Sequence, residues 1–230
     1  MKQREKYRHE LKYYIQWSDY KTLSTLLSRT MDADANANSD GEYFIRSLYF
    51  DDVFDNALRE KLSGADSREK IRIRIYGLSD EVIKLEEKRK EDGYICKQSL
   101  RLSREECERL ISGDYGFLLH RREPFARRMF YQFATQVLRP VVIVDYVREA
   151  YTFPSEDVRI TFDKNIRTAY RSIDLFNRDL LTYPATLGNG VVLEVKYNEY
   201  LPAYIRTLLQ IGAHTRSAIS KYVLCRRYEM

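Results

Sequence analysis

Glycine and proline are scarce in this chain, with 9 and 5 among 230 residues. Flexible linkers and disordered tails are rich in these residue types, so their scarcity argues against a chain dominated by linkers. Tyrosine and phenylalanine are abundant instead, with 19 and 10 residues, and both favour strands. The composition therefore predicts an ordered, strand-rich protein whose length suffices for one large domain or two small ones.

Cysteine is also rare. Cys96, Cys107 and Cys225 are widely spaced and form neither a CxxC metal motif nor a disulfide framework, which is typical of a protein from the reducing cytoplasm. The first twelve residues, MKQREKYRHELK, are charged from the start, so we expect no signal peptide. No stretch approaches the roughly 20 apolar residues of a membrane helix. We therefore expect a soluble cytoplasmic protein without a transmembrane segment.

Basic residues outnumber acidic ones, which gives a formal net charge of +5 and a pI near 8.9. A moderate positive excess suits an anionic ligand such as a nucleotide, polyphosphate or nucleic acid. The net charge by itself does not choose among these ligands.

Three segments between residues 69 and 101 alternate apolar with charged side chains: EKIRIRIYG, EVIKLEEKRK and DGYICKQSLRL. Successive side chains of a strand point to opposite faces, so each segment predicts a strand with one basic face. The residues of that parity are Lys70, Arg72, Arg74, Tyr76, Lys84, Glu86, Lys88, Lys90, Lys97, Ser99 and Arg101. The basic face either contacts solvent or lines the interior of a closed sheet.

The rest of the chain predicts more strands, with helices between them. We expect eight strands, at 7–15, 43–52, 69–77, 81–90, 92–102, 141–151, 158–170 and 188–198. Helices are expected from Ser18 as N-cap, over 53–64 up to Gly64, after the Ser103–Glu106 capping box, within 115–138 and over 200–212. The connections are short enough for antiparallel neighbours.

The signs of the charges favour a closed sheet. On the polar parity, the basic residues are Arg8, Lys12, Arg72, Arg74, Lys84, Lys88, Lys97, Arg148, Arg159 and Lys196, and the acidic ones are Glu10, Glu86, Asp163 and Glu194. The basic side chains of such a face repel one another when no ligand is bound, so we expect a polyanion to bind there. The opposite parity is apolar and requires helices over it. We therefore predict an α+β fold with a closed antiparallel eight-stranded β-barrel, flanking helices and one divalent metal.

Taken together, RHELKY, RIRIY, LEEKRK followed by Lys97, VRITFD, LEVKYN and the terminal SKY resemble the VTC domain. This family of polyphosphate polymerases belongs to the triphosphate tunnel metalloenzymes, a CYTH-like superfamily. The resemblance runs from about Tyr7 to Tyr228 and implies that residues 1–230 form a single tunnel domain. It further implies an enzyme that transfers the γ-phosphate of ATP to inorganic polyphosphate with Mn²⁺ or Mg²⁺, with no nucleic-acid partner.

The resemblance also implies roles for individual residues. Catalytic roles fall to Arg72, Arg74, Lys88, Lys97 and Arg159. Substrate-binding roles fall to Lys12, Arg8, Lys84, Arg148, Arg171, Lys196 and Lys221, with Arg167 as the alternative to Arg171. The metal ligand is Glu194. We interpret Glu10 and Glu86 as internal partners of the lysines rather than as metal ligands.

One position departs from the superfamily pattern ExExK, because Arg8 stands where the first glutamate is expected. The loss of that carboxylate disfavours a two-metal hydrolase and favours a polymerase. Two alternatives stay open: a triphosphate hydrolase on the same fold, and a binding module for polyphosphate or nucleotides that has no activity. Binding of single-stranded RNA is disfavoured, because such surfaces place aromatic rings on the ligand face, and here arginine and lysine occupy it.

Overall fold

The structure is a computed structural model that describes residues 9–91, 94–153, 157–169, 171–186, 188, 190–198, 200–209 and 218–227. The chain divides into two compact units. Unit 1 comprises residues 1–44, 146–166 and 184–220, and unit 2 comprises residues 45–145, 167–183 and 221–230. Arg8 lies outside the described residues.

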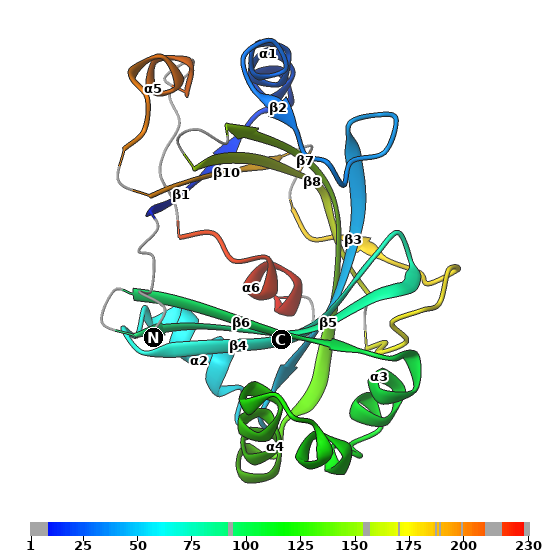
Figure 1. The fold of residues 1–230 in the computed structure, drawn as a ribbon. Coiled ribbons are helices and arrows are strands. Elements are labelled where there is room, and N and C mark those ends of the chain that lie inside the picture. The colour runs from blue at the N-terminus through cyan, green and yellow to red at the C-terminus, as the bar shows by residue number, and fades with distance from the viewer. Residues whose placement is uncertain are drawn as a thin grey trace. The chain divides into compact units, whose positions relative to one another are not determined.

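Strands and helices are both well represented, which confirms the α+β class (Figure 1). The strands are β1 (His9–Ile15), β2 (Asp32–Ala33), β3 (Glu42–Asp51), β4 (Arg68–Tyr76), β5 (Ser79–Glu91), β6 (Tyr94–Leu102), β7 (Arg139–Phe153), β8 (Val158–Ala169), β9 (Tyr183–Pro184) and β10 (Val191–Tyr197). The helices are α1 (Trp17–Leu27), α2 (Asn56–Ser63), α3 (Arg104–Ile111), the 3₁₀ turn η1 (Gly116–His120), α4 (Pro124–Gln136), α5 (Ala203–Leu209) and α6 (Lys221–Arg226). Among these described helices, none is long and apolar enough to span a bilayer.

The main strands follow the order β1-β10-β8-β7-β3-β4-β5-β6. In the part of the chain that the structure describes, no pairing joins β6 back to β1, so the prediction of a closed barrel is wrong. The alternation of side chains reports which face a residue occupies, whereas closure depends on backbone bonds between the first and last strands. The sequence of β6 does not distinguish a barrel strand from an edge strand, because exposed charged residues such as Lys97 and Arg101 suit both.

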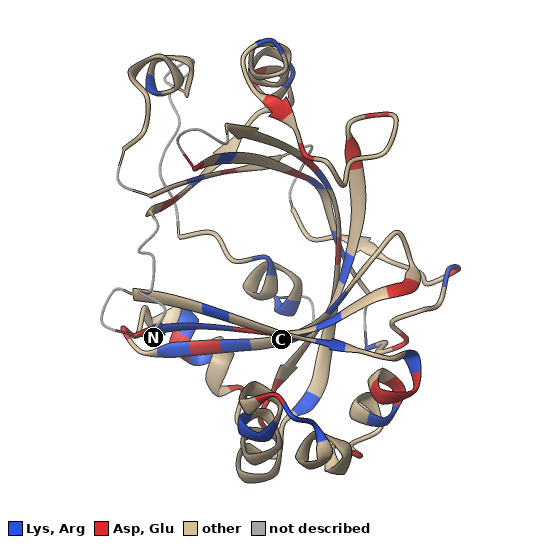
Figure 2. Cartoon of the chain, in the orientation of Figure 1, with Lys and Arg blue, Asp and Glu red and all other residues tan. Residues whose placement is uncertain are grey.

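In unit 2 the register of β4, β5 and β6 confirms the predicted parity. Arg72 lies opposite Glu86, and Glu86 lies opposite Ser99. Two further rows across the three strands are Lys70, Lys88 and Lys97, and Arg74, Lys84 and Arg101. Directly opposed residues of antiparallel strands share a face, so these side chains form one charged face. Figure 2 shows the charged residues in colour along the ribbons of β4, β5 and β6.

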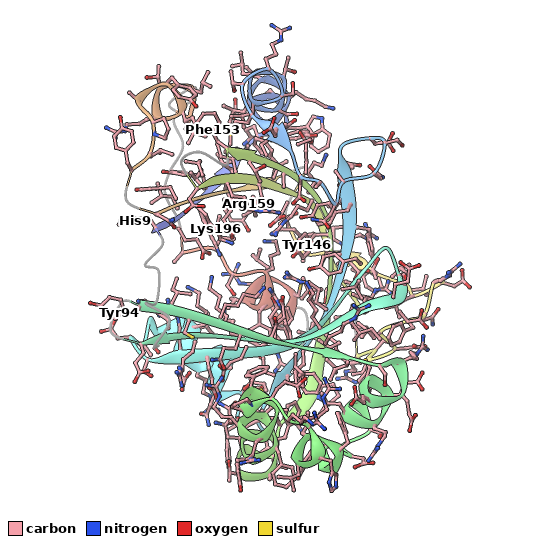
Figure 3. All side chains as sticks on the ribbon, in the orientation of Figure 1. His9, Tyr94, Tyr146, Phe153, Arg159 and Lys196 are labelled. Atoms are coloured by element: carbon pink, nitrogen blue, oxygen red, sulfur yellow. The ribbon has the colours of Figure 1, made fainter. Side chains whose placement is uncertain are left out.

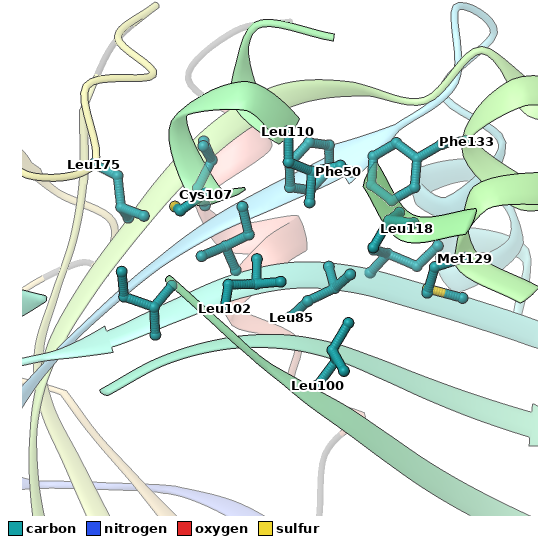
Figure 4. Close-up of a cluster of buried hydrophobic side chains, with 14 of the residues drawn as sticks. Phe50, Leu85, Leu100, Leu102, Cys107, Leu110, Leu118, Met129, Phe133 and Leu175 are labelled. Carbon is teal, nitrogen blue, oxygen red and sulfur yellow. The ribbon is translucent and has the colours of Figure 1, made fainter. Parts of the chain in front are cut away.

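The other face of the same strands is apolar and buried. The strands contribute Ile73, Leu85 and Leu100 to a buried cluster. The helices above them add Leu110 of α3, Leu118 of η1, and Met129 and Phe133 of α4 (Figure 4). The helical cover expected within residues 115–138 is thus confirmed, although it is a 3₁₀ turn followed by α4. The predicted capping box also forms, because Ser103 Oγ accepts from the Glu106 amide and Glu106 accepts from the Ser103 amide.

Unit 1 repeats this division between a charged and an apolar face. The register of β1, β10 and β8 aligns Lys12, Glu194 and Thr161 in one row and Glu10, Lys196 and Arg159 in the next. On the opposite parity, Ile160, Phe162 and Leu193 join a buried cluster with residues of α1 and α5. The apolar exterior predicted from the alternation is therefore present in both units.

Two helix predictions needed correction. The N-cap of α1 is Gln16 rather than Ser18, because the Gln16 side chain and Asp19 form the capping box. The helix α6 was missed, since its six residues are too few to show a helical period in the sequence. In Figure 1, α6 lies on the face of β4, β5 and β6 that is opposite to α3 and α4.

Candidate active site

A buried carboxylate organises the charged face of unit 2. Glu86 on β5 is 2% exposed. Its Oε2 atom lies 2.9 Å from Arg72 Nε and 2.8 Å from Arg72 Nη2, with Arg74 Nη1 at 3.5 Å. Its Oε1 atom accepts a 2.5 Å hydrogen bond from Lys97 Nζ. The structure thus brings together three of the predicted catalytic cations, and it bears out the interpretation of Glu86 as an internal partner.

These contacts keep Glu86 ionised. Burial by itself would raise the pKa of Glu86, but the charges of Arg72, Arg74 and Lys97 outweigh it and hold that pKa well below its usual value. Burial lowers the pKa of Lys97, and Glu86 only partly offsets this effect. The cluster therefore contains three cations around one anion and keeps a positive excess that suits an anionic ligand.

Tyr49 of β3 is a member of this cluster that sequence reasoning missed. Arg72 Nη1 donates a 2.7 Å hydrogen bond to the Tyr49 hydroxyl, and the Tyr49 ring stacks on Tyr222 of α6 with centroids 5.1 Å apart. Ser47 lies opposite Arg74, and Tyr49 lies opposite Arg72. Segment 43–52 is buried along most of its length, so its alternation gave no signal for these two residues.

The other predicted residues of unit 2 lie in three settings. Lys84 and Lys88 belong to the rows of the charged face, and Lys221 begins α6. Arg171 is exposed in a turn and has a left-handed φ of 53°. The alternative to it, Arg167, donates to Thr182 through Nε at 2.8 Å and through Nη2 at 2.5 Å.

Unit 1 holds a second cluster, around Glu194 of β10. Glu194 is 5% exposed. Lys196 Nζ lies 2.5 Å from its Oε1 atom, and Lys12 Nζ lies 3.3 Å from its Oε2 atom. Lys12 also lies 2.8 Å from Glu10 Oε1. Burial would lower the pKa of Lys12, but Glu194 and Glu10 raise it well above its usual value.

Two further predicted arginines of unit 1 have carboxylate partners. Arg148 of β7 forms a bidentate pair with Asp163 of β8, at 2.6 and 2.8 Å. Arg159 contacts Asp34 and donates to the Tyr43 hydroxyl at 3.2 Å. The side chains of Arg159 and Lys196 project to the same side of their strands (Figure 3). Asp34 was missed because it lies in a polar loop without alternation.

The carboxylates of unit 1 suit a divalent cation that also has phosphate oxygens as ligands. Within the described residues, no group of three or more histidine, cysteine or acidic side chains could enclose a metal. Mg²⁺ in phosphate-transfer sites, however, is usually bound by only one or two carboxylates together with phosphate oxygens. Glu10 contacts Lys12, as expected from the sequence, but its carboxylate is also the second oxygen donor beside Glu194, to which Lys12 links it. Carboxylate oxygens suit Mg²⁺ and Mn²⁺.

Comparison with solved structures defines the fold. One similar structure is a putative adenylyl cyclase from Hippeastrum, described as having a dominant triphosphatase activity, with 16% identity, 95% of each chain covered and a TM-score of 0.60. Another is the PH1819 protein of Pyrococcus horikoshii, with 14% identity, 96% of this chain and 99% of that chain covered and a TM-score of 0.51. This chain therefore shares the fold of these two structures.

The family follows from the sequence model of the VTC domain, which matches residues 7–229. This chain belongs to the VTC domain family. The resemblance drawn from its motifs is thereby confirmed. A comparison with curated proteins finds no match.

Proposed function

We propose that this protein is a metal-dependent phosphotransferase that extends inorganic polyphosphate with the γ-phosphate of ATP. The observation that supports this most strongly is the cluster of Arg72, Arg74 and Lys97 around Glu86. Arginine presents a planar fork to phosphate oxygens, and lysine acts as a point charge. A row of such cations suits a ligand that repeats its negative charge along its length.

In unit 2, Arg72 and Arg74 bind and orient the phosphate groups, and Lys97 and Lys88 balance the charge that moves to the leaving group. Phosphoryl transfer depends chiefly on such positioning and charge stabilisation. A terminal phosphate is already anionic at neutral pH, so the attacking group requires no general base.

In unit 1, Glu194 together with Glu10 would hold the Mn²⁺ or Mg²⁺ ion, and Lys12, Lys196, Arg148 and Arg159 bind further phosphate oxygens. When bound, the ion neutralises charge on the phosphates. Lys12 and Lys196 already lie against the Glu194 carboxylate and orient it.

Triphosphate hydrolysis is the second candidate. It is favoured by the likeness to the Hippeastrum protein, which is described as having a dominant triphosphatase activity. Both reactions require the same cations to bind a triphosphate. They differ in the acceptor of the phosphoryl group, which is a phosphate chain in one reaction and water in the other.

A product analysis tests the proposal. Purified protein is incubated with ATP and Mn²⁺, and the products are separated by chain length. We expect long-chain polyphosphate from the wild type and at least a 100-fold lower rate from Arg72→Ala and Glu194→Gln, because lost electrostatic stabilisation of the transferring group typically costs about 10²–10³-fold. Glu81→Gln is the matched control, because Glu81 is an exposed residue of β5 with the opposite parity.

Each other product pattern contradicts the proposal in a distinct way. Release of phosphate or pyrophosphate without polymer would establish the triphosphatase instead. If no product forms, and if Glu194→Gln binds tripolyphosphate as tightly as the wild type, the protein is a binding module without catalytic activity.

A further inference from the structure

The hydroxyl of Thr161 on β8 is buried and has no hydrogen-bond partner among the described residues. Thr161 is 1% exposed, and its Oγ1 atom forms no hydrogen bond in the part of the chain that the structure describes. A second buried threonine of the same strand behaves differently. Thr168 is also 1% exposed, but its Oγ1 atom donates to the Ile143 carbonyl at 3.2 Å. The two threonines are equally buried and differ in their hydrogen bonding.

That position lies beside Glu194. Thr161 is the direct cross-strand partner of Glu194, which in turn is the partner of Lys12. Opposed residues of antiparallel strands point to the same face, with Cβ atoms about 4.5–5.5 Å apart. The Thr161 side chain therefore lies on the face of unit 1 that carries Glu194 and Glu10.

Packing does not account for a threonine here. Valine has the same shape, suits a strand equally well and brings no polar atom into a buried site. A buried hydroxyl without a partner destabilises the folded state, and its oxygen is a hard, neutral ligand. Threonine and serine hydroxyls bind Mg²⁺ in this way in P-loop proteins, beside the phosphates of the nucleotide.

We propose that Thr161 supplies a third oxygen ligand to the divalent cation held by Glu194 and Glu10. The inference rests on the proposed function for the presence of the cation, and it adds a residue that the family resemblance did not assign. Thr161 Oγ1 has no hydrogen-bond partner among the described residues. As a ligand of the cation, this oxygen would gain the polar partner that it lacks.

Binding of Mn²⁺, measured by titration calorimetry or by electron paramagnetic resonance of the free ion, tests this without any turnover. The variants are Thr161→Val and Thr161→Ser, with Thr168→Val as the matched control and Glu194→Gln as the reference for a lost carboxylate. We expect Thr161→Val to weaken Mn²⁺ binding by about 10–100-fold, the range found when groups that support a metal site are removed. Thr161→Ser should bind within a few-fold of the wild type.

Thermal unfolding without metal provides the second readout. Thr161→Val should be at least as stable as the wild type, because it removes a hydroxyl without a partner, whereas Thr168→Val should unfold at a lower temperature. Equal Mn²⁺ affinity of Thr161→Val and the wild type would overturn the inference, as would a wild type that binds no Mn²⁺. A wild type that binds Mn²⁺ without turnover, with weaker binding in Thr161→Val, would overturn only the proposed function.

Discussion

Glu86 and Glu87 are neighbours on β5, yet they lie on opposite faces of the sheet in unit 2. Both are buried, at 2% and 0% exposed. Glu86 contacts Arg72, Arg74 and Lys97. Glu87 lies on the helix-covered face, where Arg128 of α4 contacts its Oε2 atom, while its Oε1 atom lacks a partner among the described residues. Burial raises the pKa of Glu87 despite Arg128, whereas the pKa of Glu86 is lowered.

The difference shows that burial alone does not set the charge of a carboxylate. Burial disfavours the ionised form of both residues, and the number of nearby cations decides which form prevails. The charged face surrounds one anion with three cations, and so it maintains an electrostatic site. The covered face provides hydrophobic stabilisation, and Glu87 forms an ion pair there with Arg128.

The largest effect on stability is expected from the covered face. Leu85→Ala removes a fully buried side chain of β5 from the core, so we expect a loss of about 2–5 kcal/mol in the free energy of unfolding. The matched control is Lys84→Ala on the charged face, for which we expect a change within about 1 kcal/mol. Denaturant unfolding measures both variants. Equal losses of unfolding free energy in Leu85→Ala and Lys84→Ala would show that the charged face contributes to stability as much as the covered face does.

Opposite pH dependence is expected from the two glutamates. The pKa of Glu86 is lower in the folded state, so its contribution to stability is present above the unfolded value of 4.5 and is lost as the pH falls below it. The pKa of Glu87 is raised above 4.5, so its protonated form stabilises the fold at low pH, and that contribution is lost as the pH rises through the folded pKa. Each unit of pKa difference corresponds to about 1.4 kcal/mol.

Glu86→Gln and Glu87→Gln separate these contributions when unfolding free energies are measured from about pH 4 to pH 7. Relative to the wild type, Glu86→Gln should be least stable near pH 7, and its deficit should shrink on acidification. Glu87→Gln should gain on the wild type as the pH rises. Slopes of the same sign for both variants would contradict the assignment of opposite ionisation to the two faces.

The sequence predicts the faces well because alternation reports side-chain direction directly. It placed Arg72, Glu86 and Lys97 on one face and Ile73 and Leu85 on the other, as the register confirms. Alternation carries no information about strand closure, so the predicted closed barrel was wrong.

Partners that lie far apart in the chain were the other limit of sequence reasoning. Tyr49 is 23 residues from Arg72, and its segment is almost wholly buried. Thr161 looks like an ordinary strand residue until the register sets it opposite Glu194. The roles assigned to Arg72, Lys97 and Glu194 remain predictions, which the product analysis tests.

The smallest effect should come from an ion pair that is short but exposed. On α3, Arg104 Nε lies 2.6 Å from Glu108 Oε1, with the two side chains 44% and 57% exposed. This contact is shorter than the 2.9 Å between Arg72 Nε and Glu86, yet solvent screens it, so Glu108→Gln should change the free energy of unfolding by at most about 0.5 kcal/mol. The measurement is denaturant unfolding at low and high salt. A change as large as that of Glu86→Gln would mean that contact distance, rather than burial among several cations, determines what a carboxylate contributes in this protein.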